Sequence, residues 1–263
     1  MKTPTFGFRT LWLASAAALA CAAAVVVAPR PAQAQELITN GGFESGFTGW
    51  TREDQTGSDG TFFLQTGTES PLNGFPVPTP PEGANAAMTD AGAGGSHVLY
   101  QDFVVPVGMT TGTLSFSLFL NSGAEFVTPE NLDWAATNPF GGQNLNQQAR
   151  VDLLLATADP FSVAAGDILL NVFQTAPTDP LTSGYADFSV DVSAVLAAHQ
   201  GQTLRLRFAE VDNISFLNLG VDRVSLGATA VVPEPASLLL MLTGGGVLLG
   251  SARLVRRRCQ REA

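Results

Sequence analysis

In the stretch Leu114-Ser115-Phe116-Ser117-Leu118-Phe119-Leu120, a large apolar side chain occupies every second position. Successive side chains of a β-strand point to opposite faces, so this period of two predicts a strand with one face in a core. The same period recurs in Leu204-Arg205-Leu206-Arg207-Phe208-Ala209, whose second face carries charge. Further strands are expected at 188–192 and 220–226, and more fully buried ones at 151–155 and 168–173. With only 192–199 suggesting a short helix, the sequence predicts an all-β fold.

The segments between these strands are rich in Gly, Pro, Asn, Ser and Thr, as in a β-sandwich or barrel. Two of them are long. Residues 67–85 hold many Pro and Gly and cannot form a central strand. Residues 121–148 contain Phe126, Trp134 and Phe140 among polar residues. A loop of that length in a compact domain is usually functional or disordered.

Charge and cysteine content limit the possible functions. The chain of 263 residues has a net charge of −10, but residues 35–232 hold five Arg, no Lys and 21 acidic residues, a net of −16. Such a surface repels nucleic acid and anionic lipid headgroups, and suits divalent cations, neutral glycans or simple solubility. Both cysteines, Cys21 and Cys259, lie outside this part. Disulfides, thiol catalysis and cysteine-based zinc sites are therefore excluded there.

The first 34 residues have the three parts of a secretion signal. Lys2 and Arg9 supply positive charge, residues 11–28 are apolar, and Ala32-Gln33-Ala34 is a small-x-small cleavage site. We therefore expect residues 1–34 to be a signal peptide. A lipoprotein signal ending at Cys21 is the alternative, although Ala18 stands where a lipobox prefers Leu.

The last 34 residues, 230–263, combine Pro233-Glu234-Pro235, an apolar run over 236–252 and a basic tail. Seventeen uncharged residues are at the short end of what can cross a bilayer as a helix. A basic segment after such a helix favours the cytoplasmic side. The tail's arginines are Arg253, Arg256, Arg257, Arg258 and Arg261.

This order of parts resembles the PEP-CTERM sorting signal, which exosortases of Gram-negative bacteria recognise. The resemblance implies a precursor held transiently in the inner membrane by one transmembrane helix. It also implies processing by an exosortase at Pro233, Glu234 and Pro235, and delivery to the cell surface or extracellular matrix. An ordinary C-terminal anchor with a basic stop is the alternative.

A second resemblance lies at the start of the middle part. Leu37-Ile38-Thr39-Asn40-Gly41-Gly42-Phe43-Glu44-Ser45-Gly46, followed by Gly49-Trp50, is similar to the opening of carbohydrate-binding modules with the galactose-binding-like jelly-roll fold. His97-Val98-Leu99-Tyr100-Gln101-Asp102-Phe103 and Val221-Asp222-Arg223-Val224-Ser225-Leu226 follow in the family's order. The resemblance implies a jelly-roll β-sandwich ectodomain over 35–229, with Trp50 in its core.

The same resemblance implies a metal site, and the charged faces of the predicted strands indicate a sugar site. Glu44 and Asp222 are expected to lie near each other and to help hold a structural calcium ion, together with carbonyl and water oxygens. The alternative is that both acids cap turns. Arg205 and Arg207 with Trp134 and Tyr100 could form a sugar site, an aromatic platform with a few directed hydrogen bonds. The alternative there is a solvated sheet face paired with carboxylates.

Catalysis has little support in the sequence. His97 and His199 are the only histidines, lie far apart, and neither has a metal-ligand spacing. Nucleophile-elbow, phosphate-loop and dinucleotide motifs are absent, and nothing selects two carboxylates for glycoside hydrolysis. We therefore predict a non-enzymatic, glycan-binding surface or matrix protein. Its expected partners are exosortase, extracellular polysaccharide and, transiently, the inner membrane, but not nucleic acid. A passive structural or adhesion protein and a glycan-active hydrolase are the alternatives.

Overall fold

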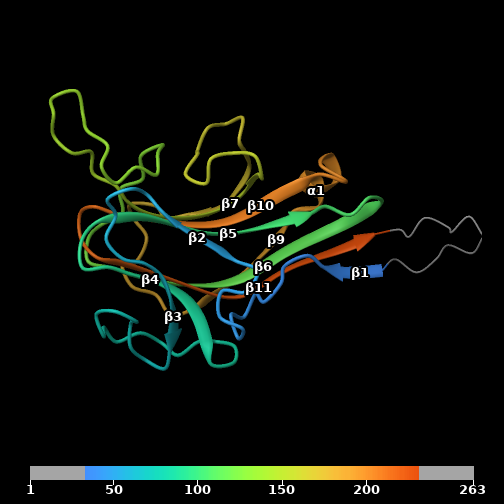
Figure 1. Ribbon diagram of the computed structural model, residues 1–263, viewed down its shortest axis with the longest axis horizontal. Helices are drawn as coiled ribbons and strands as arrows, with labels where there is room; N and C mark the ends of the chain where they lie inside the picture. The colour runs from blue at the N-terminus through green and yellow to red at the C-terminus, as the bar shows by residue number, and fades with distance from the viewer. Residues whose placement is uncertain (1–32, 231–263) are drawn as a thin grey trace, which may run out of the picture. The chain divides into compact units, whose positions relative to one another are not determined.

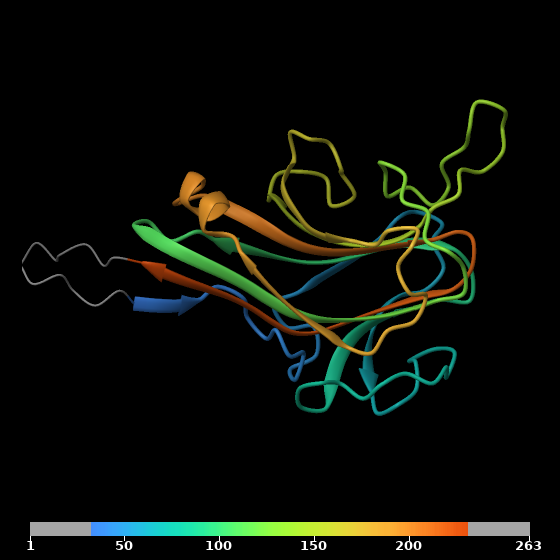
Figure 2. The ribbon, with the colours of Figure 1, turned by 180° about the vertical axis from the view of Figure 1, so that it is seen from behind.

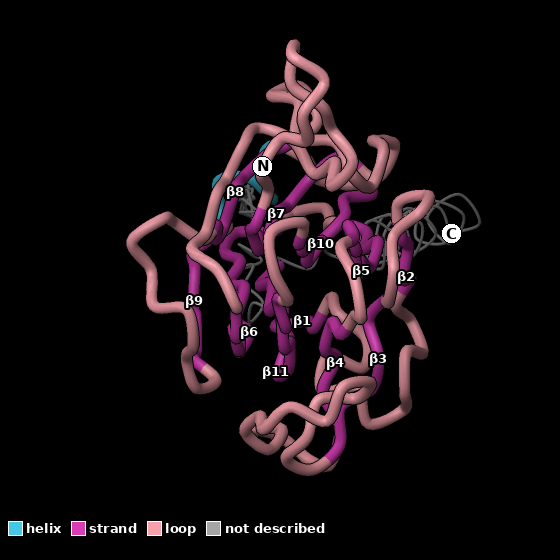
Figure 3. Tube along the Cα trace, turned by 90° about the vertical axis from the view of Figure 1, so that its left-hand side faces the viewer, coloured by secondary structure: helices cyan, strands magenta, loops and turns pink. Residues whose placement is uncertain are grey.

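The computed structural model describes residues 33–230, which fold into two antiparallel β-sheets (Figure 1). Within these residues the elements are β1 (Gln33–Glu36), β2 (Thr51–Asp54), β3 (Thr61–Thr66), β4 (Asn85–Asp90), β5 (Gly95–Val104), β6 (Met109–Ser122), β7 (Gln147–Leu155), β8 (Ile168–Gln174), β9 (Ala186–Asp191), α1 (Ser193–Ala198), β10 (Thr203–Asp212) and β11 (Leu217–Ala230). The first sheet has the order β3-β4-β11-β6-β9, with β1 also paired to β11. The second has the order β2-β5-β10-β7-β8. Figure 3 shows the two sheets as separate layers.

The hydrophobic core lies between the two sheets. The alternating apolar residues of β6 supply one wall, and those of β10 supply the other. The rings of Phe116 and Phe208 meet edge to face across the core, with centroids 5.7 Å apart. Trp50 is buried as expected, between Phe43 and Phe208. The two period-two stretches thus line one core, and the prediction of an all-β fold built from facing sheets is confirmed. Jelly-roll connectivity stays a prediction.

One burial expectation is wrong. Residues 168–173 were expected to form a strand as buried as 151–155, yet β8 is only half-buried. The reason is its position: β8 pairs with β7 alone and forms an edge of the second sheet. Strand β7 has neighbours on both sides and is buried over nearly its whole length. The short helix expected at 192–199 is confirmed as α1.

Three strands have no clear signal in the sequence. All four side chains of β2 are exposed, so no apolar alternation marks it. Strand β4 is buried but is built largely from small residues, including Ala86 and Ala87. With β3, these strands complete one edge of each sheet. Strand β2 is thus defined by its backbone pairing, whereas Phe62 of β3 and Met88 of β4 pack in hydrophobic clusters.

Two long segments project from the outer side of the second sheet: residues 123–146, between β6 and β7, and residues 156–167, between β7 and β8 (Figure 2). Polar side chains fix the first of them. Ser96 Oγ accepts a hydrogen bond of 3.0 Å from the Trp134 backbone N–H, and Asn213 Nδ2 donates one of 2.7 Å to the Trp134 carbonyl. Gln148 Nε2 donates to the Asn131 carbonyl at 3.0 Å. This segment is therefore held in one place on the sheet.

Both ends of the described chain lie at the same end of the first sheet. Strand β1 pairs with the last residues of β11, placing Gln35 opposite Ala228. The expected cleavage point between Ala34 and Gln35 therefore falls inside β1. The rest of the predicted signal peptide, the Pro233-Glu234-Pro235 motif, the apolar run and the basic tail lie outside the described residues. Within 33–230, no helix has the length and apolarity needed to span a membrane.

Candidate functional site

Buried ion pairs cover the outer face of the second sheet, where the sequence predicts charge. Arg207 on β10 lies opposite Asp152 on β7, and the two form a salt bridge. Arg150 also binds Asp152, with 2.7 Å between Arg150 Nη2 and Asp152 Oδ1. Burial opposes ionisation of Asp152, but hydrogen bonds from Arg150 and the charge of Arg207 outweigh it and lower the pKa of this carboxyl. Arg205 makes a similar pair with Asp102 on β5, at 2.7 Å and 3.0 Å.

This face is covered rather than solvated. Arg207 Nη1 donates hydrogen bonds to the carbonyls of Pro160 and Ser162, at 2.6 Å and 2.7 Å. Arg205 donates in the same way to the carbonyls of Ala156 and Ala158. Residues 156–167 therefore lie over the ion pairs, so the arginines are paired with carboxylates, as the alternative predicts, but the face is covered rather than solvated. Arg207 is fully buried and has no surface to offer a sugar in this structure.

The other three predicted sugar-site residues lie on the same side of the sheet. The Arg205 guanidinium stacks over the Tyr100 ring, 3.9 Å from its centroid. Tyr100 and Trp134 both pack against one apolar cluster on the outer face of β5 and β10, formed by Val98, Leu132, Ala209 and Val211. Trp134 Nε1 is buried and has no acceptor among the described residues. The structure thus brings Tyr100, Arg205 and Trp134 together beside the two projecting segments.

A cavity of about 300 Å³ opens between these segments. Asp133 and Asp159 bring a carboxylate from each segment, and Phe161 brings an aromatic ring. Each carboxylate fixes its own segment through one oxygen: Asp133 Oδ1 accepts from Gln55 Nε2 at 2.6 Å, and Asp159 Oδ1 accepts from the Phe161 N–H at 2.8 Å. No hydrogen bond within 33–230 engages the second oxygen of either. The lining residues are Gln55, Asn131, Leu132, Asp133, Asp159, Phe161 and Val163.

None of the four residues predicted for a sugar site lines this cavity, although Leu132, Phe161 and Val163 pack on the same apolar cluster as Tyr100 and Trp134. The sequence analysis identified the correct face of the second sheet but not the residues that line the cavity. Asp133 lies in the long segment marked as functional or disordered, which was a usable signal. Asp159 and Phe161 lie in a short turn-rich stretch with nothing to distinguish them.

The N-terminal motif closes around the bulge of β11. Asn40 adopts a left-handed backbone with φ of 55°, and its side-chain amide donates to the carbonyls of Gly46 and Thr48. Gly41 approaches β11 so closely that a Cβ there would lie 1.7 Å from the Val224 carbonyl oxygen. The motif therefore requires glycine at this position, and the resulting turn presents Glu44.

Glu44 and Asp222 converge on one segment of backbone, residues 82–85. Glu44 Oε1 accepts hydrogen bonds from the N–H groups of Ala84 and Asn85, at 2.9 Å and 2.8 Å. Asp222 Oδ2 accepts from the Glu82 N–H at 3.0 Å. Burial, together with the negative charges of Glu82 and Glu44, raises the pKa of Asp222 to about 6. Both predicted carboxylates thus bind the backbone of residues 82–85, and Glu82 lies near enough to influence Asp222, but the three are not among the described groups whose ligand atoms lie within 4.8 Å of one another.

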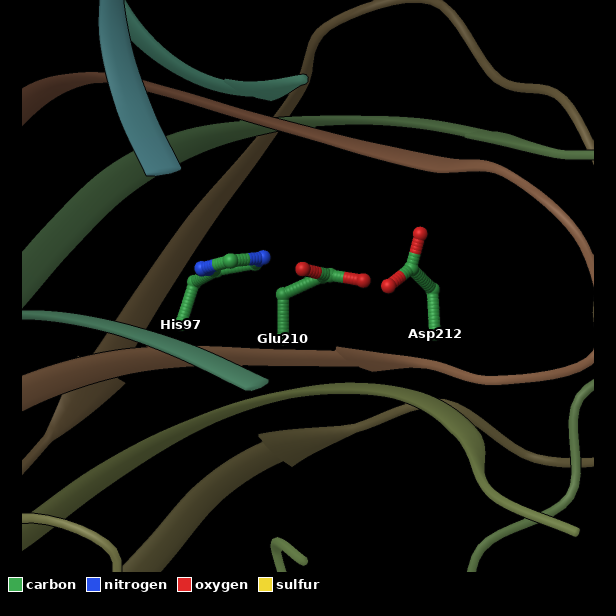
Figure 4. A group of neighbouring side chains, drawn as sticks. All are labelled: His97, Glu210 and Asp212. Atoms are coloured by element: carbon green, nitrogen blue, oxygen red, sulfur yellow. The ribbon is translucent and has the colours of Figure 1, made fainter. Parts of the chain in front are cut away.

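A further polar group lies inside the sandwich. His97, Glu210 and Asp212 are all buried, and each offers a ligand atom within 4.8 Å of the others (Figure 4). The sequence interpretation gave His97 no metal-ligand neighbours, and the structure corrects this. The neighbours come from β10, far along the chain, and strand pairing places Glu210 directly opposite His97.

No family model matches the chain, and no curated protein matches it. Solved structures to which the chain is distantly similar include TmCBM61 in complex with β-1,4-galactotriose, at 11% identity and a TM-score of 0.41, covering 73% of this chain and 97% of that one. Another is the Stig cyclase Fisc from Fischerella sp. TAU, at 16% and 0.43, covering 76% and 100%. A third is the K1 cleaved adhesin domain of Lys-gingipain from Porphyromonas gingivalis W83, at 11% and 0.39, covering 76% and 98%. Likenesses this distant assign neither a family nor a ligand to the chain.

Proposed function

We propose that this protein is an exported, non-catalytic glycan-binding protein of the cell surface or extracellular matrix. The observation that carries the proposal is the cavity between residues 123–146 and 156–167. It combines the apolar side chains of Leu132, Phe161 and Val163 with polar groups on Gln55 and on the two carboxylates. Sugars present apolar C–H faces and a ring of hydroxyl groups, so they suit a pocket with an apolar surface and a few placed polar groups.

The cavity is also held rigidly. Arg205 and Arg207 fix residues 156–167 through backbone carbonyls, and Gln55, Ser96 and Asn213 fix residues 123–146. A binding surface that is ordered in advance loses less conformational entropy when a ligand binds. This favours recognition over a merely structural role for these long segments.

Charge narrows the class of glycan. Asp133 and Asp159 line the cavity, and residues 35–232 carry a net charge of −16. Acidic polysaccharides would be repelled from such a surface, so neutral or cationic glycans are the proposed ligands.

A glycan array with the full-length protein tests this function, with neutral, cationic and acidic polysaccharides side by side. Phe161→Ala should lower the affinity for the best ligand about tenfold or more. This is the loss expected for a side chain that contributes at least ~1.4 kcal/mol to binding. Phe140→Ala is the matched control, because Phe140 is almost fully exposed and does not line the cavity.

Three results of that experiment would point elsewhere. Cleaved products from a bound glycan would favour the glycan-active hydrolase. A blank array would favour the passive structural or adhesion protein. Equal losses in Phe161→Ala and Phe140→Ala would place any binding outside the cavity.

We further propose that an exosortase sorts the protein at Pro233-Glu234-Pro235, on the strength of the three-part order of residues 230–263. Replacing the tripeptide by three alanines should leave the precursor in the inner membrane with its C-terminus intact, as measured by intact mass. Normal processing of this variant would leave only a generic C-terminal anchor.

The third proposal is a calcium ion held by Glu44 and Asp222, with Glu82 as an additional oxygen ligand. The donor set fits, because all three side chains are carboxylates and calcium binds oxygen ligands. The backbone also makes room for them. A Cβ on Gly83 would lie 2.4 Å from the Glu44 carboxyl carbon, and one on Gly42 would lie 3.4 Å from that of Glu82.

A further inference from the structure

Three titratable side chains meet between the sheets, where β5 begins and β10 ends. His97 lies directly opposite Glu210, and Asp212 lies opposite Gly95, two residues further along the same face of β10. Figure 4 shows Glu210 standing between His97 and Asp212. Among the residues that the structure describes, this is the one group of three such side chains whose ligand atoms lie within 4.8 Å of one another.

Two of the three side chains, His97 and Glu210, have buried atoms without partners. His97 and Glu210 are each 1% exposed and Asp212 is 3% exposed. Within 33–230, His97 Nε2 and both carboxylate oxygens of Glu210 are buried without a hydrogen bond. Leaving such groups unsatisfied costs several kcal/mol in general, so native proteins rarely keep them without a ligand, water or ion. Three unsatisfied atoms in one buried group indicate that something binds there.

We propose that His97, Glu210 and Asp212 bind a divalent transition-metal ion, His97 through Nε2 and each acid through a carboxylate oxygen. The site is separate from the glycan cavity and does not depend on the proposed function. A neutral imidazole with two carboxylates carries a charge of −2, which a divalent ion cancels. That neutrality removes the main cost of burying two carboxylates side by side.

The ligand set indicates which metals fit. One imidazole nitrogen and two carboxylates, with no sulfur, form the mixed nitrogen and oxygen set used by Zn²⁺, Mn²⁺ and Fe²⁺. Calcium binds oxygen ligands almost exclusively, so the histidine disfavours it. Asp54 adds an outer partner: its Oδ1 lies 2.7 Å from His97 Nδ1, opposite the free nitrogen. Metal-binding histidines usually have such a carboxylate, which fixes the ring and leaves Nε2 free to bind.

The backbone leaves space at this position. A Cβ on Gly95 would lie 2.5 Å from His97 Nε2, so glycine keeps the free nitrogen uncovered. Gly95 also donates its N–H to Asp212 Oδ1 at 2.7 Å, which orients the second carboxylate. A cavity of about 230 Å³ between residues 91–94 and 212–216 reaches Asp212 from outside and offers a path for the ion.

Zinc titration of the full-length protein tests the proposal, after EDTA treatment and with excess Ca²⁺ present to occupy the acidic surface. Calorimetry should show one equivalent of Zn²⁺ per chain. Glu210→Gln and His97→Gln should remove this binding. Asp54→Asn, which changes only the outer partner, should weaken it about 10–100-fold. Co²⁺ in place of Zn²⁺ should give visible absorption bands that report its nitrogen and oxygen ligands.

The chain offers a matched control in its only other histidine, the surface residue His199. His199→Gln should bind Zn²⁺ as the wild type does. Equal losses in His199→Gln and His97→Gln would mean adventitious surface binding and would overturn the site. If the buried variants fail to fold, the titration of the wild-type protein remains the test. Less than one equivalent of bound Zn²⁺, or the absence of Co²⁺ absorption bands, would reject the proposal.

Discussion

Individual carboxylates in this acidic domain have very different surroundings. Asp152 is fully buried, yet two arginines neutralise it. Glu210 is equally buried, and burial together with the charges of Asp212 and Asp54 raises its pKa well above the usual range. Asp187 is largely exposed and only loosely paired with Arg223, at 3.3 Å. The effect of removing a charge should therefore depend on what each carboxylate contacts, and not on the net charge.

Asp152→Asn should be strongly destabilising. It leaves Arg150 and Arg207 buried without their carboxylate, and breaking a buried pair from one side costs about 3–5 kcal/mol. At roughly 2–4 °C per kcal/mol for a domain of this size, the melting temperature should fall by about 6–20 °C. Asp187→Asn is the control, since an exposed pair contributes about 0–1 kcal/mol. Similar shifts in the two variants, measured by calorimetry, would contradict the assigned role of the buried ion pairs.

Calcium should stabilise the protein through Glu44 and Asp222. A ligand that binds only the folded state at a hundredfold excess over Kd adds about 2.7 kcal/mol, or a shift of very roughly 5–10 °C. Asp222→Ala should lose most of this shift at ~0.15 M salt, where diffuse binding to surface charge is screened. Equal melting points with EDTA and with calcium, in the wild type and in Asp222→Ala, would mean that Glu44 and Asp222 cap turns and do not bind calcium.

Among the larger elements, residues 156–167 are held to the sheet by Arg205 and Arg207, of which Arg207 is the fully buried one. Arg207 joins them to the sheet, because its guanidinium binds Asp152 on one side and two loop carbonyls on the other. A lysine keeps the charge but cannot form this planar fork of hydrogen bonds. The loop should therefore be the first element to loosen when Arg207 is replaced.

Arg207→Lys should speed amide hydrogen exchange across residues 156–167 and weaken glycan binding at the neighbouring cavity. Arg150→Lys is the matched control, because Arg150 binds the same Asp152 but none of the loop carbonyls. Exchange mass spectrometry of both variants measures the difference. Unchanged protection of 156–167 in Arg207→Lys would show that the loop is held by other contacts.

The predictability of each strand follows from its side chains. Strands β6, β9 and β10 carry large apolar residues at every second position, so the pattern alone predicts them and their buried face. Strand β2 has no apolar residue, and only its backbone bonds to β5 define it. An apolar run can also lie at an edge, as β8 does, because hydrophobicity does not specify the number of neighbouring strands.

Sites were harder to predict than strands, because they depend on register and on covering loops. Alternation places Arg205 and Arg207 on one face, but it does not reveal that residues 156–167 cover that face. Strand pairing sets Asp54, His97 and Glu210 in a row across three strands. No spacing along the chain encodes that row. Glu44 and Asp222 were paired only through resemblance to a family, and their convergence on residues 82–85 is consistent with that pairing.

For the whole domain, the raised carboxyl pKa values of Asp212 and Asp222 act in the same direction as that of Glu210 on the response to pH. Burial raises the pKa of Asp212 to about 7, with Asp59 adding to the effect, and that of Asp222 to about 6. The ordinary value for both is 3.8. At pH values between 3.8 and the raised pKa of each group, the folded state still holds a proton that the unfolded chain has lost. Stability should therefore decrease as the pH rises through this window.

In EDTA, the melting temperature should be higher at pH 5 than at pH 8. Adding Zn²⁺ and Ca²⁺ should reduce the difference, because a bound cation offsets the charge that appears as Asp212 and Asp222 ionise. Asp212→Asn should flatten the upper part of the curve. A metal-free melting temperature that rises steadily from pH 5 to pH 8 would be inconsistent with both raised pKa values. Scanning fluorimetry across a buffer series is sufficient for the measurement.

The position of the end of β11 has a consequence if the protein is attached through residues 230–263, as proposed above. Ala230 ends β11 opposite Met109, at the start of β6, and Pro233 follows three residues later. Residues 123–146 leave the other end of β6, which is 14 residues long and so spans about 45 Å. The length of β6 thus separates residues 123–146 from the end of β11. Fixed by its last strand, the domain would hold this loop clear of the anchoring surface, where long polymers are easier to capture.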